Sequence, residues 1–235
     1  MTDPDAPNSM PAEALSQLYG ARFAGSEHEG RRRLWQCLVR NFFRRHIPPT
    51  ARVLDVACGF GEFINAVEAA ERTAIDLNPD AGRHLEAGVR FIHDDIRALR
   101  RMPAAAFDII FCSNFLEHLP DHAAVEDTVR QFRRLLAPGG RLILMGPNAR
   151  LIPGAYWDFW DHRVPITDRS LGELLRANGF AIETMVARFL PYTTRSILPS
   201  WPVFVRLYLW LRPLWFLLGK QFLAIATPER LSTPQ

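Results

Sequence analysis

Acidic side chains end several expected strands, and a glycine-rich turn follows the first of these strands. The stretch "DVACGFG" covers residues 55–61, so that Asp55 precedes Gly59 and Gly61. Asp76 ends the second expected strand and Asp95 ends the third. Glycines let the backbone approach a ligand, and open parallel sheets bind ligands beyond the carboxyl ends of their strands. The sequence therefore predicts a small-molecule site at this edge.

The turn does not fit the common phosphate-binding loops. A dinucleotide fingerprint needs a further glycine where this chain has Ile64, and Glu62 would face a pyrophosphate with the wrong charge. A P-loop is excluded because no Gly-Lys-Ser/Thr follows. Carboxylates at Asp76 and Asp95 can instead accept hydrogen bonds from ribose hydroxyls and from an adenine amino group. The predicted ligand is an adenosine without phosphates, with Ile96 packed on the purine face.

A second set of reactive side chains follows the fourth expected strand. Glu117 and His118 lie in "NFLEHLPDH", and the unperturbed pKa of histidine suits a base near neutral pH. His162, in "YWDFWDHRVPITDRS", is the second candidate base. Alternatively, Glu117 and His118 only cap the loop and bond the backbone. His122 is four residues after His118, but Pro120 interrupts a helix there and no third ligand is apparent, so no metal site is predicted.

Aromatic and acidic residues alternate in the stretch 156–170. Trp157, Phe159 and Trp160 are interleaved with Asp158 and Asp161. Such a surface suits a sugar ring or another flat organic acceptor, and the alternative is a small aromatic core with a polar edge.

The elements that must position these residues alternate between strands and helices. Helical spacing covers residues 12–47, with a break at 20–26, and Pro48 and Pro49 end it. The first strand is expected at 52–56, the second ends at 76, and the others are expected at 89–95, 107–114, 141–146, 180–189 and 220–227. Helices are expected at 62–70, 79–87, 121–137 and 170–177. Ser170 and Glu173 have the spacing of a capping box, and Gly179 is expected to end that helix. The glycines of "APGG" are expected to close the helix 121–137.

This alternation predicts an α/β fold, a Rossmann-like, seven-stranded, mostly parallel sheet with helices on both faces. The expected organisation is a disordered segment 1–11, a helical extension 12–49, a ligand-binding core 50–190, an apolar insertion 191–219, a last strand 220–228 and a tail 229–235.

Five motifs in this order resemble the class I S-adenosylmethionine-dependent methyltransferases. They are "VLDVACGFG", "AIDLNPD", "FIHDDI", "FDIIFCSNFLEHL" and "LLAPGGRLIL". The resemblance implies an enzyme whose cofactor is S-adenosyl-L-methionine. It places Asp55, Gly59 and Gly61 at the methionine part of the cofactor. Ala57 departs from the usual D-x-G-x-G-x-G pattern, and a slightly shifted turn is expected there.

The other implied cofactor contacts come from the later motifs. Asp76, with Leu77 beside it, would hold the ribose, and Asp95 and Ile96 would hold the adenine. Asp94 competes for the adenine role, and the register of "HDDI" favours Asp95. Asn114 and Phe115 would line the transferred methyl group.

The insertion before the last strand is unusually apolar. Residues 200–218 contain three tryptophans and many leucines, but prolines and arginines interrupt the stretch too often for a membrane span. We expect a lid or docking helix pair over the acceptor site, and second a contact with a membrane surface or a lipidic substrate. A further hypothesis is that this apolar segment contacts a second copy of the chain in a homodimer.

The aromatic rim and the tail are similar to methyltransferases of bacterial polysaccharide and glycolipid biosynthesis. This second resemblance implies a sugar hydroxyl as the methyl acceptor, with a lipid-linked glycan as one candidate. The alternatives are O- or N-methylation of a small aromatic or polyketide-like product, and a non-catalytic S-adenosylmethionine-binding module.

The amino-acid composition limits the classes of partner that the protein is expected to bind. The net charge is +3 and basic residues are not concentrated as in a nucleic-acid binder, so no nucleic-acid partner is predicted. Asp108 is expected to anchor the fourth strand and not to react. Three dispersed cysteines and the lack of a signal peptide indicate a cytoplasmic protein, which could lie at the inner face of the membrane.

Overall fold

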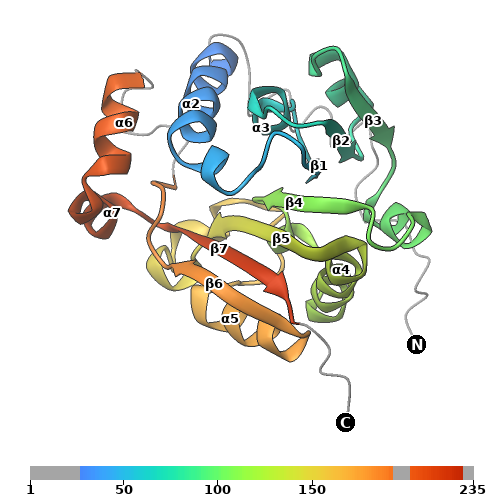
Figure 1. The fold of residues 1–235 in the computed structure, drawn as a ribbon. Helices are drawn as coiled ribbons and strands as arrows, with labels where there is room; N and C mark the ends of the chain where they lie inside the picture. Colours follow the sequence, from blue (N-terminus) through green and yellow to red (C-terminus); the bar gives the residue numbers. More distant parts are fainter. Residues whose placement is uncertain (1–26, 193–201, 230–235) are drawn as a thin grey trace.

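The protein, described from a computed structural model over residues 27–192 and 202–229, is built on one seven-stranded sheet (Figure 1). The strand order is β3-β2-β1-β4-β5-β7-β6, and only β7 runs antiparallel to its neighbours. This confirms the predicted seven-stranded, mostly parallel sheet. The strands are β1 (Arg52–Val56), β2 (Glu71–Asp76), β3 (Val89–His93), β4 (Phe107–Ser113), β5 (Leu136–Pro147), β6 (Phe180–Val186) and β7 (Gln221–Pro228).

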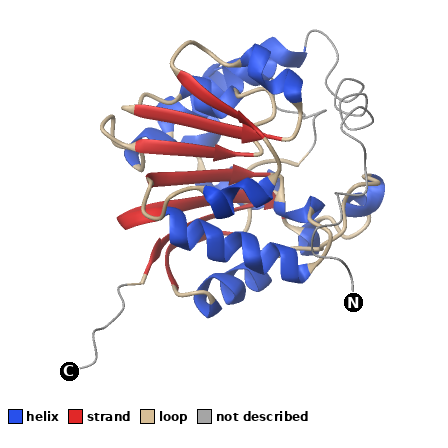
Figure 2. Ribbon diagram, turned by 90° about the vertical axis from the view of Figure 1, so that its right-hand side faces the viewer, coloured by secondary structure: helices blue, strands red, loops and turns tan. Residues whose placement is uncertain are grey.

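Helices cover both faces of the sheet, each over its own apolar core (Figure 2). One core lies under α2 (Glu27–Asn41), α3 (Glu62–Ala66), α6 (Pro202–Trp210) and α7 (Arg212–Leu218). The other lies under α4 (His122–Leu135) and α5 (Asp168–Ala177). The middle strand β4 buries four consecutive residues, Ile109 to Cys112, between the two layers, as its continuous apolar run predicts.

Several element ends differ from the prediction for local reasons. The helix expected at 62–70 ends at Ala66, and the one expected at 79–87 is the 3-10 helix η2 (Pro79–His84). The capping box of α5 is formed by Thr167 and Ser170, not by Ser170 and Glu173, so the helix starts at Asp168. The "APGG" segment does not cap α4, because β5 already begins at Leu136 and passes through it with a shifted register. Gly179, with φ of 72°, ends α5 as predicted.

The short connections at the carboxyl edge are 3-10 turns. They are η3 (Ile96–Arg101), η4 (Leu116–His118), η5 (Ala149–Leu151) and η6 (Ala155–Asp158), and η1 (Phe43–Arg45) follows α2. Of the helical extension expected at 12–47, residues 12–26 lie outside the described part, as do the expected disordered segment 1–11 and most of the tail.

The apolar insertion forms the helix pair α6 and α7, which lies against α2 (Figure 1). The Tyr208 hydroxyl donates to the Phe189 carbonyl at 2.8 Å, and the Trp215 indole donates to the Tyr208 carbonyl at 2.8 Å. The Trp215 ring also meets Phe189 edge to face. These contacts hold the pair on the segment after β6, while α6 itself packs on α2. The role of the pair as a lid over an acceptor stays a prediction. No helix among the described residues is long and apolar enough to span a bilayer.

Candidate functional site

The glycine-rich turn after β1 has three residues in the left-handed conformation. Ala57 has φ of 55°, Gly59 of 57° and Gly61 of 73°. A Cβ on Gly61 would lie 2.3 Å from Leu85, so only glycine fits there, whereas a Cβ on Gly59 would meet nothing within 4 Å. Ala57 adopts the conformation that a glycine prefers, at a cost of roughly 1–2 kcal/mol. The turn therefore keeps its left-handed shape despite the alanine, and it is open beside Gly59.

Asp76, at the end of β2, is tied directly to this turn. Its carboxylate accepts from the Gly59 N–H and from the Asn78 N–H, both at 2.8 Å. Burial raises the pKa of the Asp76 carboxyl, while these two N–H groups lower it. Each carboxylate oxygen can accept a second hydrogen bond. Asp76 thus lies where the ribose contact is expected, with acceptor capacity left.

Asp55 is the second buried acid beside the turn. One of its carboxylate oxygens has no hydrogen-bond partner among the described residues. Burial raises the pKa of Asp55 well above its usual range, and Glu62 and Asp76 raise it further. Leaving a buried polar atom unsatisfied costs about 1–3 kcal/mol. A ligand that brings a hydrogen-bonding or positively charged group to this end of the turn would remove that cost. The Asp55 carboxylate is thus compatible with the ammonium group of S-adenosylmethionine, and its place at the methionine part stays a prediction.

Glu62, which was expected to repel a pyrophosphate, is buried and pairs with Arg31 at 3.0 Å. It therefore links the turn to α2. The expected role of Glu62 against a phosphate ligand is not tested by this contact.

Asp95 follows β3 and caps η3. Its carboxylate accepts from the Arg97 N–H and from the Arg97 side chain, both at 2.7 Å. Burial opposes the charged form, but these contacts with Arg97 hold the pKa of Asp95 below its usual range. Asp94, the competing residue, instead pairs with Arg101. Asp95 is thus a fixed, charged acceptor at the edge of the sheet, and its adenine role stays a prediction.

The remaining predicted cofactor residues lie at the same edge. Asn114 follows β4 with φ of 51°, is exposed, and its N–H donates to the Met145 carbonyl at 3.0 Å. Phe115 and Ile96 are half-buried against the core below α4. The Leu77 carbonyl lies 3.1 Å from a ring nitrogen of His93. The structure therefore brings the predicted cofactor residues to the carboxyl ends of β1 to β4.

The predicted reactive residues Glu117, His118 and His162 form one cluster. The backbone brings them together, because the Glu117 carbonyl accepts from the N–H groups of Arg163 and Val164 at 2.8 and 3.2 Å. The rings of His118 and His162 meet edge to face with centroids 5.0 Å apart. Glu117 is fully buried, and burial raises the pKa of its carboxyl. The cluster connects η4 with a segment more than forty positions later in the chain.

The sequence did not reveal the partner of His118. His118 Nδ1 lies 3.2 Å from the backbone carbonyl of Asp161 and 3.3 Å from its carboxylate. Asp161 was seen in the sequence only as one of the acids among the aromatic residues. Asp161 is too far from His118 along the chain for any sequence pattern to link them. The pair becomes visible only because the chain returns to the carboxyl edge of the sheet.

The same cluster has the groups of a metal site. One ligand atom each from Glu117, His118 and His162 lies within 4.8 Å of the others. His122, which the spacing had suggested as the second ligand, is not in this group. The structure thus gathers a different set of possible ligands from the His118 and His122 pair considered in the sequence, and the arrangement can serve either proton transfer or a cation.

Aromatic rings surround His162. Phe159 stacks on it with centroids 5.1 Å apart, and Tyr156 lies 4.6 Å from it. Tyr156 is buried and donates its hydroxyl to the Val164 carbonyl. Trp157 and Trp160 are 56% and 89% exposed. The segment therefore combines a small aromatic core around His162 with two exposed indoles at the rim.

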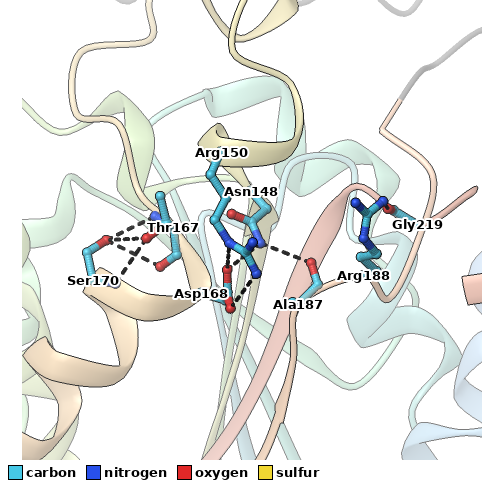
Figure 3. A network of polar contacts seen from close by, with 8 residues as sticks. All are labelled: Asn148, Arg150, Thr167, Asp168, Ser170, Ala187, Arg188 and Gly219. Carbon is cyan, nitrogen blue, oxygen red and sulfur yellow. Dashed lines mark hydrogen bonds and ion pairs between the residues drawn. The ribbon is translucent and has the colours of Figure 1, made fainter. Parts of the chain in front are cut away.

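A partly buried polar network fixes the base of this segment (Figure 3). The Asn148 side chain, after β5, donates to the Asp168 carboxylate at 2.7 Å and to the Ala187 carbonyl at 3.0 Å. Arg150 pairs with the same carboxylate at 2.6 Å. These bonds join the ends of β5 and β6 to the start of α5. Sequence reasoning singled out neither Asn148 nor Arg150, because both lie in an unremarkable loop.

Asp108 pairs with the Arg52 side chain at 2.9 Å and accepts from its N–H at 2.8 Å. It therefore fixes β4 to β1 at the edge away from the site, in agreement with the anchoring role expected of it.

Comparisons with known proteins agree on the region that carries these motifs. The family described as "Methyltransferase domain" matches residues 27–185. A "Ubiquinone biosynthesis O-methyltransferase" from Xanthomonas axonopodis pv. citri is 32% identical over 179 residues, which are 65% of this chain and 72% of that protein. A protein of the same name from Xylella fastidiosa is 39% identical over 122 residues, and the chain spans only 48% of its length.

Solved structures show the same fold. A protein described as a SAM-dependent methyltransferase from Archaeoglobus fulgidus superimposes with a TM-score of 0.61 at 20% identity, over 90% of this chain and 98% of that one.

Proposed function

Because the chain belongs to the family of S-adenosylmethionine-dependent methyltransferases, we propose that it methylates a hydroxyl oxygen of a flat, ring-bearing acceptor, with His118 as the base. The cofactor supplies an activated methyl group, and the protein mainly positions the acceptor oxygen in line with it. The observation that carries the proposal is the contact of His118 Nδ1 with Asp161.

His118 has the environment that a base requires. A proton held on Nδ1 by the Asp161 carbonyl and carboxylate leaves Nε2 to accept a proton from a substrate hydroxyl. Removal of that proton assists transfer to an alcohol or a phenol. Glu117 is buried with a raised pKa and is better suited to orient the cluster through a hydrogen bond than to act as the base.

The acceptor class rests on two observations. The relatives are named for O-methylation in ubiquinone biosynthesis, which favours a hydroxyl on a ring. The aromatic side chains of Tyr156 and Phe159 around His162 suit such a ring by stacking. A phenolic hydroxyl is therefore our first acceptor, in agreement with the aromatic alternative from the sequence.

A glycan hydroxyl, the first expectation from the sequence, is the second candidate. The exposed Trp157 and Trp160 alternate with Asp158 and Asp161, an arrangement that suits a sugar ring. The names of the relatives do not support a role in polysaccharide biosynthesis.

The apolar helix pair supports a lipidic acceptor or contact with a membrane surface. Leu207 and Trp210 on α6 and Phe216 and Leu217 on α7 are exposed, and Trp210 is 78% exposed. Large apolar side chains exposed together on one surface mark interaction sites, whereas single exposed ones do not.

The test compares acceptors and variants in one methyl-transfer assay. We expect turnover with a simple catechol and little with a free hexose. His118→Ala should lower kcat by about 10²–10⁴-fold while the calorimetric affinity for S-adenosylmethionine stays unchanged. His122→Ala, a matched change outside the cluster, should keep parent activity.

Three outcomes would redirect the proposal. Full activity of His118→Ala would transfer the role of base to His162. Activity abolished by a chelator and restored by a divalent cation would make Glu117, His118 and His162 metal ligands. Cofactor binding without transfer to any acceptor would favour a non-catalytic binding module.

A further inference from the structure

A hollow lined by arginines lies between α2 and α6, away from the cluster of Glu117, His118 and His162. Its volume is about 400 Å³, and its polar lining consists of Arg33, Gln36, Arg40, Asn41, Arg44 and Arg206. Among the described residues that line it, none is acidic. The sequence analysis found no concentration of basic residues typical of a nucleic-acid binder. The structure instead adds a fourth arginine, Arg206, from a helix more than 160 positions later.

The positive charges of the hollow are poorly balanced. Arg33 pairs with Glu29 at 3.6 Å, but Arg40, Arg44 and Arg206 have no carboxylate partner in the described part of the chain. Elsewhere in the same part, many arginines are paired, as in Arg31, Arg52, Arg97, Arg100, Arg101, Arg141 and Arg150. Like charges gathered without a counter-charge repel one another, and an anion between them would relieve this repulsion.

The two walls of the hollow are held together by packing. The Cys37 thiol, buried in α2, donates to the Pro202 carbonyl of α6 at 3.5 Å. The Asn41 amide donates back to the Cys37 carbonyl at 2.7 Å. Arg40 and Arg44 are four apart on one wall, and Arg206 faces them from the other. The arginines therefore surround a space that exists before any ligand binds.

We propose that this hollow binds a phosphomonoester or diphosphate group. The planar guanidinium group forms paired hydrogen bonds with phosphate oxygens and stays charged at all physiological pH values. Val203 and Trp210, three and four positions from Arg206 on α6, are both exposed. A phosphate attached to an apolar body would therefore place its charge in the hollow and its body on α6. A phospholipid headgroup and a soluble phosphorylated compound share this chemistry.

The first experiment measures binding of inorganic pyrophosphate to the full chain by calorimetry. The double variant Arg40→Gln/Arg206→Gln should weaken binding at least tenfold. The control Arg32→Gln/Arg169→Gln removes the same charge from exposed positions outside the hollow and should change the affinity less than twofold. Cofactor affinity, measured in parallel, shows that each variant is folded, and it separates this test from that of methyl transfer.

The second experiment distinguishes the two sources of phosphate. The protein is sedimented with phosphatidylcholine vesicles, with and without phosphatidic acid. Sedimentation only with phosphatidic acid, lost in Arg40→Gln/Arg206→Gln but not in the control, identifies a lipid headgroup as the ligand. Pyrophosphate binding without sedimentation identifies a soluble phosphorylated compound. Binding of neither probe, or equal weakening in both double variants, overturns the proposal.

Discussion

His118 Nδ1 lies 3.2 Å from the Asp161 carbonyl and 3.3 Å from the Asp161 carboxylate, so one residue holds the imidazole through two acceptors. Both side chains are mostly buried, with 20% and 12% of their surface exposed. If His118 acts as the proposed base, the backbone carbonyl selects the tautomer and the carboxylate stabilises the imidazolium that forms when Nε2 takes a proton. In this proposal Asp161 is a positioning residue, and its role can be separated from that of the base.

Asp161→Asn should lower kcat by about tenfold to a thousandfold, because the amide can stabilise the imidazolium only weakly. The backbone carbonyl contact survives, so the loss should be smaller than in His118→Ala. An unchanged kcat would reduce Asp161 to a purely structural role.

Asp76→Asn should weaken S-adenosylmethionine binding at least tenfold, since charge-assisted hydrogen bonds contribute about 1.5–3 kcal/mol each. Burial raises the pKa of Asp76, so its folded state binds a proton more readily than the unfolded chain does. The charge of Asp76 thus costs stability in the apo protein at neutral pH, but Asp76→Asn should not recover it fully, because the amide has one acceptor oxygen for the Gly59 and Asn78 N–H groups. Calorimetry measures the affinity and urea unfolding the stability.

Cofactor affinity should also fall as the pH drops from neutral toward the raised pKa of Asp76, because the protonated carboxyl loses acceptor capacity. In Asp76→Asn this pH dependence should flatten. A parent-like pH dependence in the variant would assign it to another group.

Substitutions of Ala57 test how strongly stability and cofactor binding depend on the left-handed turn. Ala57→Gly should change stability by less than about 1 kcal/mol, because relief of the positive φ is offset by the greater chain entropy of glycine. Ala57→Val should be strongly unfavourable in the same conformation, since β-branched residues rarely adopt it. We expect weaker cofactor binding and a lower thermal midpoint in the valine variant only. Equal behaviour of the two variants would show that the turn reshapes freely.

Asp168→Asn should destabilise the fold by about 1–3 kcal/mol at neutral pH, because it weakens a partly buried network with the buried Asn148 and with Arg150. Burial raises the pKa of Asp168, but its bonds to Arg150 and Asn148 lower it more, so the net pKa lies below the usual value. The stabilisation is then complete above the usual aspartate pKa of about 4 and is lost as the pH falls through the folded value. Urea unfolding should show the variant and parent converging in acid.

Glu126→Gln is the matched control for this prediction. Its pair with Arg130 is exposed and four residues apart on α4, so its removal should cost no more than about 0.5 kcal/mol. A similar loss of stability in both variants would show that the network stabilises the fold no more than an exposed ion pair does.

Local sequence determined much of this protein. The apolar run 109–112 could only be a strand buried on both faces, and alternation of strands and helices fixed a parallel sheet. The parallel arrangement in turn places Asp55 and Asp76 at one edge, because the carboxyl ends of neighbouring parallel strands coincide. That the predicted cofactor residues gather at one edge of the sheet was therefore predictable from residues close to strand ends.

The arrangement of the residues proposed for the acceptor side was decided by the tertiary structure. His118 meets Asp161 and His162 only because the Glu117 carbonyl accepts two N–H groups from the returning segment. The arginine hollow likewise requires α6 to pack on α2. Such contacts depend on how distant segments pack, and neither periodicity nor spacing along the chain records them, whereas a turn or a strand end is set by its own few residues.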